Sequence, residues 1–254
     1  MEQNLRAFNW GRLFCEQPQS VFTAADLNSK KSENISIDKY VNNFSSILEK
    51  YQNKEYSKIF LSNVKKVIEK ENQIKNSKKE LPLSRKVALT LFRAMRYKDE
   101  YEVARLHTSG DFAQTFFNEN KNAKMEYYLA PPLFSKKDPD TGHLLKRRFG
   151  HSVYKIFKII SYFKFLRGTK LDIFGYTLER KKERALAQKT INTINKISEI
   201  LNDNNYKKII EFLDIPLSIK GYGHVKEKNI KIAEEKWDKS FDKILNNQNL
   251  KKVS

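Results

Sequence analysis

Apolar residues recur at the spacing of an α-helix along most of this chain, and that spacing restricts the fold more than any other feature. Between residues 38 and 75 they return every three or four positions, as at Val41, Phe44 and Leu48, which predicts two helices or one long bent one. The chain also holds only 8 Gly and 6 Pro, fewer than the tight turns of an all-β protein need. We therefore expect a mainly α fold. The other predicted helices cover residues 4–15, 84–108, 149–166, 178–202, 205–213 and 224–246.

One short part of the chain favours β-structure instead. The segment KMEYYL, residues 124–129, is a candidate strand that Pro131 and Pro132 end. The turn-rich segment KKDPDTGH, residues 136–143, then predicts a hairpin or an exposed loop. The sequence thus predicts a multi-helix domain with a small β element, a hairpin or short strands, near residues 124–145.

The chain is strongly basic, and this charge has two interpretations. Its formal net charge is +19, which is typical of a surface that binds an anionic partner. However, 38 of the 49 basic residues are Lys and only 11 are Arg, the residue best suited to bidentate phosphate and base contacts. Compositional drift toward Lys, Asn and Ile codons is therefore the favoured explanation for most of the charge, with an anion-binding surface as the alternative.

The single cysteine, Cys15, excludes a disulfide within one chain and an iron–sulfur cluster held by several thiolates of this chain. Charges within the first six residues argue against a signal peptide, and no run reaches the roughly 18 apolar residues of a membrane span. We expect a soluble protein in a reducing compartment, most simply the cytoplasm, with no membrane partner.

Signatures of catalysis and of cofactor binding are missing from the sequence. It has no glycine-rich phosphate loop and no serine or cysteine nucleophile motif. The four histidines are scattered rather than spaced like metal ligands on one helix. We therefore predict no catalytic, cofactor-binding or metal-binding residue in this chain.

Three local clusters of charge and glycine stand out. The first, YKDEYEVARL at residues 97–106, predicts either a solvated helix face or a network at a buried contact, with Lys98–Glu102 and Glu102–Arg105 pairs. The second, residues 166–184, combines two glycines, a threonine able to cap a helix and Glu/Arg pairs, which predicts a tight loop leading into a helix.

The third cluster is KGYGHVK, residues 220–226. Its two glycines permit backbone angles closed to other residues, and His224 beside them is either a functional histidine or a loop histidine bonded to backbone.

These clusters, in this order, carry a resemblance to a known family. YKDEYEVARL, LAPPL at residues 129–133, LRGT-x-LD-x-FGYT-x-ER at residues 166–180 and GYGHVK at residues 221–226 resemble the C-terminal domain of unassigned function in fused bacterial indolepyruvate ferredoxin oxidoreductases. RAFNWGR, residues 6–12, is similar to the tail of the gamma-type domain that precedes it there. His107 and Lys220 depart from the family, in which we expect an aromatic residue and an arginine.

The resemblance implies a domain organisation and a chemistry. It implies a gamma-type tail at residues 1–27, a linker at 28–36, a helical domain at 37–246 and a tail at 247–254. In the family, an aryl 2-oxoacid is oxidatively decarboxylated to an acyl-CoA and electrons pass to ferredoxin. Thiamine diphosphate, an iron–sulfur cluster and CoA are then expected on partner domains, with none in this chain. The chain is accordingly expected to be part of an enzyme assembly, without catalysing anything alone.

The leading hypothesis is therefore a structural or docking component that contacts the catalytic domains and meets ferredoxin only indirectly. The runner-up is a basic helical nucleic-acid-binding module using residues 143–189, where 13 Lys or Arg face 3 acidic residues. Two further hypotheses are coenzyme A binding on the basic surface and an inactive remnant of a split gene. The predicted partner-contact residues are Tyr97, Asp99, Glu100, Arg105, Arg167, Gly168, Thr169, Tyr176, Glu179, Arg180, Gly221, Gly223 and His224.

Overall fold

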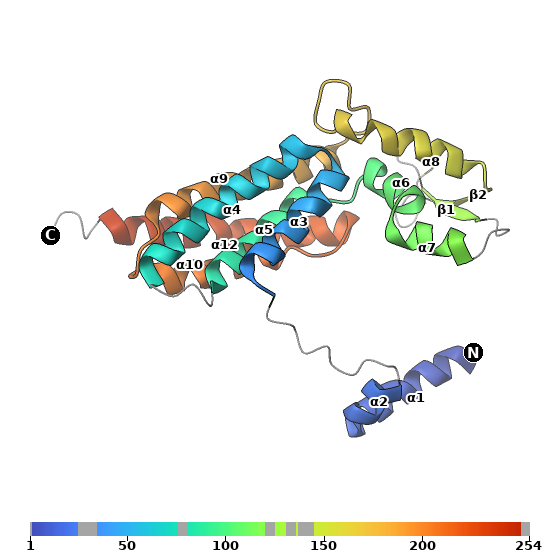
Figure 1. Cartoon of the computed structure of the whole chain (residues 1–254), viewed down its shortest axis with the longest axis horizontal. Helices are drawn as coiled ribbons and strands as arrows, with labels where there is room; N and C mark the ends of the chain where they lie inside the picture. Colours follow the sequence, from blue (N-terminus) through green and yellow to red (C-terminus); the bar gives the residue numbers. More distant parts are fainter. Residues whose placement is uncertain are drawn as a thin grey trace. The chain divides into compact units, whose positions relative to one another are not determined.

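The computed structural model describes residues 2–24, 35–75, 81–119, 125–130, 136 and 145–249. The chain divides into two compact units, Met1–Tyr40 and Val41–Ser254. Within the described residues the fold is mainly α with one two-stranded antiparallel sheet, which confirms the predicted fold class (Figure 1). None of the described helices combines the length and the apolar character that crossing a membrane requires.

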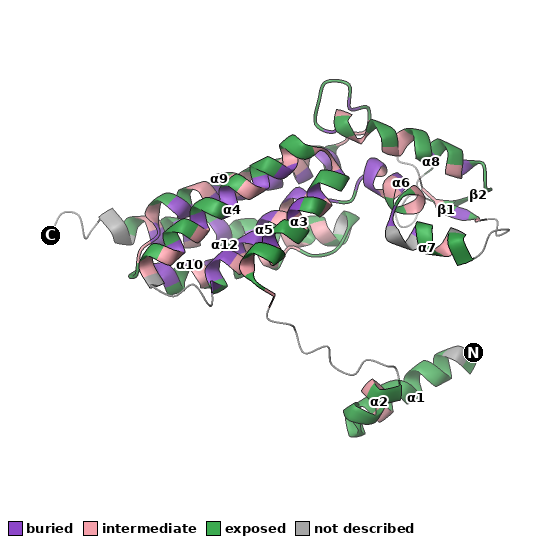
Figure 2. Cartoon of the chain, in the orientation of Figure 1, coloured by how far each residue is buried: buried purple, intermediate pink, exposed green. Residues whose placement is uncertain are grey.

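The first unit holds α1 (Glu2–Glu16) and α2 (Pro18–Ala24). The helix predicted at residues 4–15 is α1, whereas no sequence pattern predicted α2. Phe14 and Phe22 pack edge to face with 5.5 Å between their ring centroids. Leu5, Phe8 and Trp10 are exposed, and Figure 2 shows α1 as exposed along most of its length. Residues 28–34 of the predicted linker lie outside the described residues.

The second unit contains a helical bundle. Residues 38–75 form two helices rather than one, α3 (Ile37–Tyr51), which belongs to this unit from Val41 onward, and α4 (Lys54–Lys75). Helices α4, α5 (Pro82–Met95) and α9 (Leu178–Ile200) pack against one another, as Figure 1 shows. Helix α5 also contacts α10 (Tyr206–Phe212) and α11 (Asp214–Leu217), and both of these pack on α12 (Gly223–Asn249). The largest fully buried apolar side chains of the core include Leu48, Tyr51, Phe60, Leu91, Ile194 and Trp237.

A smaller layer of the same unit joins helices to the hairpin. It comprises α6 (Glu100–Thr108), α7 (Asp111–Glu119), β1 (Tyr127–Leu129), β2 (Arg147–Phe149), α8 (Val153–Tyr162) and the 3₁₀ turn η1 (Phe163–Leu166). The strands pair with Tyr127 opposite Phe149. Ala104, Tyr127, Val153 and Phe157 form the buried centre of this layer.

His107 completes that small core as an aromatic residue. Its ring stacks on Phe157 at 5.6 Å and meets Tyr127 edge to face at 5.4 Å. Burial, helped by the positive charge of Lys98, lowers the pKa of His107, so the ring is neutral near pH 7. The histidine thus occupies its position as an aromatic side chain would.

Helix α5 is capped by a residue of another helix. Leu81 precedes it and has no side chain able to accept a hydrogen bond, so the free amides of the first turn need another acceptor. The fully buried carboxylate of Glu71 in α4 accepts from the amides of Leu83 and Ser84 at 3.1 and 2.7 Å. It also accepts from the hydroxyls of Ser84 and Tyr206 at 2.6 and 2.5 Å.

Two predicted helices are shorter than expected. The helix predicted over residues 84–108 is broken, because the chain leaves α5 at Arg96 and restarts only after Asp99, which caps α6 by accepting from the amide of Glu102 at 2.8 Å. The helix predicted from residue 149 begins at Val153, because Phe149 ends β2. The segment around 136–143 lies, except for Lys136, outside the described residues.

Candidate functional site

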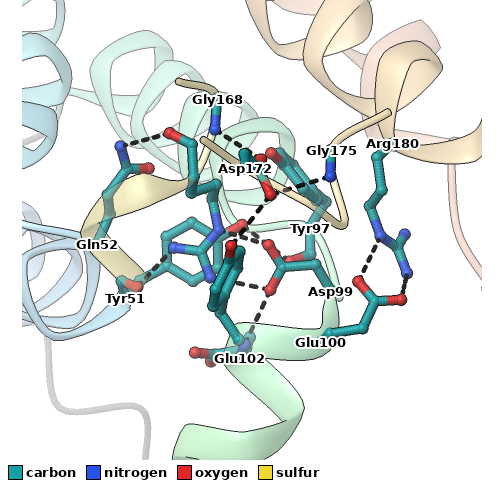
Figure 3. A network of polar contacts seen from close by, with 12 residues as sticks. Tyr51, Gln52, Tyr97, Asp99, Glu100, Glu102, Gly168, Asp172, Gly175 and Arg180 are labelled. Atoms are coloured by element: carbon teal, nitrogen blue, oxygen red, sulfur yellow. Dashed lines mark hydrogen bonds and ion pairs between the residues drawn. The ribbon is translucent and has the colours of Figure 1, made fainter. Parts of the chain in front are cut away.

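The centre of the candidate site is a buried ion pair between Arg167 and Asp99. Arg167, only 4% exposed, donates from Nε and one terminal nitrogen to the Asp99 carboxylate at 2.5 and 2.9 Å. Its other terminal nitrogen donates to the carbonyl of Tyr51 at 2.7 Å. The guanidinium also lies 3.7 Å from the ring centroid of Tyr51 and 5.4 Å from that of Tyr101. This cation, at the end of η1, thereby joins Tyr51 of α3 to Asp99 at the start of α6, and Figure 3 labels both partners.

The loop that follows Arg167 folds around a second buried acid, Asp172. One carboxylate oxygen accepts from the amide of Gly175 at 2.9 Å and from the hydroxyl of Tyr101 at 3.2 Å. The other accepts from the amide of Gly168 at 2.8 Å (Figure 3). We call Tyr51, Asp99, Tyr101, Arg167 and Asp172 the buried network.

Glycine is needed at two positions of this loop, for a different physical reason at each. Gly168 has a φ of +79°, which an L side chain rarely adopts. At Gly175 a Cβ atom would lie 2.3 Å from a carboxylate oxygen of Asp172, so only glycine lets the backbone approach the acid.

Further ion pairs surround the buried network. Glu102, 3% exposed, accepts from Arg105 at 2.7 and 2.9 Å and from Arg96 at 3.2 and 3.3 Å. This confirms the predicted Glu102–Arg105 pair. The predicted Lys98–Glu102 pair is wrong, because Lys98 precedes α6 and its ammonium lies over the ring of Tyr222 at 4.9 Å.

The three sequence clusters converge through these contacts. Arg180, near the start of α9, pairs with Glu100 in α6 at 3.3 and 3.4 Å (Figure 3). Glu183 in α9 accepts from Lys226 in α12 at 2.6 Å, and the Lys98–Tyr222 contact joins the first cluster to the third. Residues 97–106, 166–184 and 220–226 therefore meet in space, as expected if they act together.

Burial and neighbouring charges shift the pKa values of Tyr97 and of several residues of the buried network. Burial and then the charge of Asp99 raise the pKa of Tyr97 to about 12. Burial also raises the pKa of Tyr51 and of Tyr101, although the charge of Arg167 opposes it. Burial alone lowers the pKa of Arg167, but hydrogen bonding to Asp99 and nearby charges outweigh it, so the pKa is raised. The phenols therefore stay neutral and the guanidinium stays charged across physiological pH.

The predicted contact residues fall into three groups. Tyr97, Asp99, Arg167 and Arg180 are buried and bonded within the chain or packed in its core, and Glu100 and Arg105 are partly buried. Their contact with a partner stays a prediction. His224 lies in the first turn of α12, and its side chain is outside the described residues. The exposed members are Gly168, Thr169, Tyr176, Glu179, Gly221 and Gly223.

Several residues of the site were not predicted. Tyr51 belongs to α3 and donates its hydroxyl to the carbonyl of Tyr97, 46 positions away, so no local pattern pointed to it. Asp172 had a local signal, because it stands four residues after Gly168 and three before Gly175. Thr177 is the predicted helix cap, and its hydroxyl accepts from the amide of Arg180 at 3.4 Å.

Outside this region, the described residues include one open hollow and no cluster of metal ligands. An open hollow between α10, α11 and α12 is lined by residues that include Lys208, Phe212, Ile215, Ser240 and Lys243, and it contains none of the predicted contact residues. Among the described residues, no three His, Cys, Asp or Glu side chains are grouped as metal ligands would be.

The model of a family of unknown function, DUF6537, matches residues 37–239. The chain belongs to this family. The DUF6537 match begins at the first residue of α3 and ends within α12, so it contains the whole buried network. No curated protein and no solved structure matches the chain.

Proposed function

We propose that this chain is a non-catalytic docking component of an indolepyruvate-type 2-oxoacid:ferredoxin oxidoreductase. Partner domains or subunits would hold thiamine diphosphate, the iron–sulfur cluster and CoA, oxidise the aryl 2-oxoacid and pass electrons to ferredoxin. The free, exposed Cys15 fits a reducing compartment, and we place the chain in the cytoplasm.

One observation carries this proposal: the charged side chains in the motifs of the resemblance bind one another. Arg167 is bonded to Asp99 and Tyr51, and both oxygens of Asp172 accept hydrogen bonds from groups of the chain. Charged groups saturated in this way hold segments in place, whereas a general acid or base must reach a substrate. The motifs therefore support a scaffold, and a scaffold acts by presenting a surface to a partner.

The test is purification of the tagged full chain from its native host under gentle conditions, with an untagged strain as the control. We expect a thiamine-dependent oxidoreductase subunit in near-equal amount, identified by mass spectrometry. The same eluate should then reduce a dye in the presence of a 2-oxoacid and CoA.

Two results would contradict the proposal. If the chain purifies without a partner and without activity, the resemblance reflects common ancestry only. Bound nucleic acid that is released by about 0.2 M salt would instead favour a nucleic-acid-binding module, because phosphate contacts are lost as counterions return. Charge reversal at Asp99 is unsuitable as a docking test, because this carboxylate is 3% exposed and its loss changes the fold itself.

A further inference from the structure

Helix α8 has an apolar stripe that the rest of the chain covers only in part. Val153 and Phe157 face the small core, where they pack with Ala104 and Tyr127. Ile156 and Ile159, on the adjoining side of the helix, are 53% and 61% exposed. Figure 2 shows this mixture of buried and exposed turns along α8. Exposed apolar residues that occur singly are ordinary, but a continued stripe is typical of a binding surface.

The stripe continues into η1 as a group of aromatic rings. Tyr162, Phe163 and Phe165 are 75%, 41% and 47% exposed. Their ring centroids lie 5.7 to 6.4 Å apart, so the rings contact one another on the surface. We call Ile156, Ile159, Tyr162, Phe163 and Phe165 the α8 face.

The end of the α8 face is fixed rather than adaptable. Lys164, between the aromatic residues, donates to the carbonyl of Lys50 in α3 at 2.5 Å. Arg167 follows η1 directly and is anchored in the buried network. Tyrosine and phenylalanine rings held in one arrangement before binding lose little conformational freedom on contact with a partner.

The charged residues of the segment that carries the α8 face all have one sign, and the exposed acid nearest to it is Glu49 of α3, beside Lys164. Residues 150–171 contain no Asp or Glu, while Lys155, Lys158 and Lys170 are exposed. Among the described residues, none forms an ion pair with these three lysines. A partner surface that covers the α8 face therefore needs acidic residues around an apolar centre.

We propose that the α8 face is the docking surface of this chain and that its occupant is a protein surface with an apolar centre and an acidic rim. This inference rests on the proposed docking role and gives that role a location outside the buried network.

Two different occupants agree less well with these observations. A second copy would bring the same lysines together across a symmetric interface, which is repulsive. An anionic lipid surface would be satisfied by any amphipathic helix and would not require η1 to be anchored by Lys164 and Arg167. An anchored η1 is instead suited to binding a protein surface that has a defined shape of its own.

The test places a photoreactive benzoylphenylalanine at Ile159 of the tagged full chain in its native host. The matched control places it at Ile232 of α12, which is 44% exposed. We expect position 159 to cross-link to one identified protein at a peptide flanked by Asp or Glu, and position 232 to give no such product.

A second measurement tests the acidic rim with the purified cross-linked partner. Lys155→Glu with Lys158→Glu should slow association about tenfold at low salt, and the difference should shrink as salt is added. Lys236→Glu with Lys239→Glu, an exposed pair of the same spacing on α12, should leave association unchanged. An equal effect of both pairs would overturn the acidic rim.

The outcomes separate this inference from the proposed function. A cross-link from position 159 to a thiamine-dependent oxidoreductase subunit supports both. A cross-link to a different acid-flanked protein supports the α8 face and contradicts the proposed function. If the oxidoreductase co-purifies without a cross-link from position 159, the proposed function stands and the α8 face is wrong. Cross-linking to a second copy, or flotation of the chain with phosphatidylglycerol vesicles, would also overturn the inference.

Discussion

Arg167 shows how a single side chain satisfies a charge inside this fold. Three of its nitrogens donate hydrogen bonds, two of them to one carboxylate, and the ring of Tyr51 covers its face at 3.7 Å. Removal of one partner from such a pair leaves an uncompensated charge in a dry environment, which costs far more than the pair contributes. The ion pair is therefore best tested by replacing one of its two residues and then both.

We predict that Arg167→Met lowers the free energy of unfolding by about 3–5 kcal/mol, because Asp99 is left buried and unpaired. Urea unfolding followed by circular dichroism measures this loss. The control is Arg148→Met, because Arg148 forms an exposed ion pair with Glu126 and should be nearly neutral. Adding Asp99→Leu to Arg167→Met should restore part of the stability; a fully additive loss would contradict the pairing.

Gly175 gives a second residue-scale prediction. A methyl group there would overlap the Asp172 carboxylate, so neighbouring atoms must move to make room for it. Gly175→Ala should therefore lower the free energy of unfolding by about 1–3 kcal/mol. Thermal melts should show a lowered transition for Gly175→Ala. Gly150→Ala is the matched control, because nothing lies within 4 Å of the added Cβ, and similar melts for both variants would refute the close approach.

Among the elements, sequence periodicity predicted most helices and placed several of their ends, such as those of α9 and α10, within two residues. The apolar spacing of α4, α5 and α9 is local, so it was visible in the sequence. The break between α5 and α6 was not, because it depends on Asp99 pairing with Arg167, 68 residues away. The three clusters of the site were recognised because each of them, like a helix, is a local sequence pattern. The bonds between the clusters, such as Arg180 to Glu100, depend on tertiary contacts.

Helix α5 carries the prediction at this scale. Glu71→Ala should destabilise the chain by at least about 2 kcal/mol, because the Leu83 and Ser84 amides and the Tyr206 hydroxyl lose their acceptor. Denaturant unfolding measures the loss. Glu69→Ala removes an exposed carboxylate from the same helix and serves as the control. If the two variants unfold at the same urea concentration, the cap does not stabilise α5.

At the scale of the whole molecule, buried phenols link stability to alkaline pH. Burial is the largest cause that raises the pKa of Tyr51, Tyr56, Tyr97, Tyr101 and Tyr206 above 10. In the unfolded chain these groups release their protons near pH 10, whereas the folded chain retains them. The unfolded state therefore binds fewer protons above pH 10, and stability falls as the pH rises.

We predict that the midpoint of urea unfolding is constant up to about pH 9 and falls between pH 10 and about 12, the range set by Tyr97. Tyrosinate absorbance recorded on the same samples should rise together with unfolding. Tyr97→Phe should reduce the fall, while Tyr128→Phe, at a 62% exposed position, should not. A midpoint that is flat through pH 12 would show that the phenols ionise without unfolding the chain.

The Arg167 pair also has a consequence for the order of synthesis. Asp99 leaves the ribosome 68 residues before Arg167, and Tyr51 leaves 116 residues before it. At about 5–20 residues per second, the 68-residue delay lasts roughly 3–14 seconds. During that interval Asp99 lacks Arg167, the cation that it binds in the folded chain. The joint between α3 and α6 can close only when translation has passed η1, so folding of the first half waits for the second.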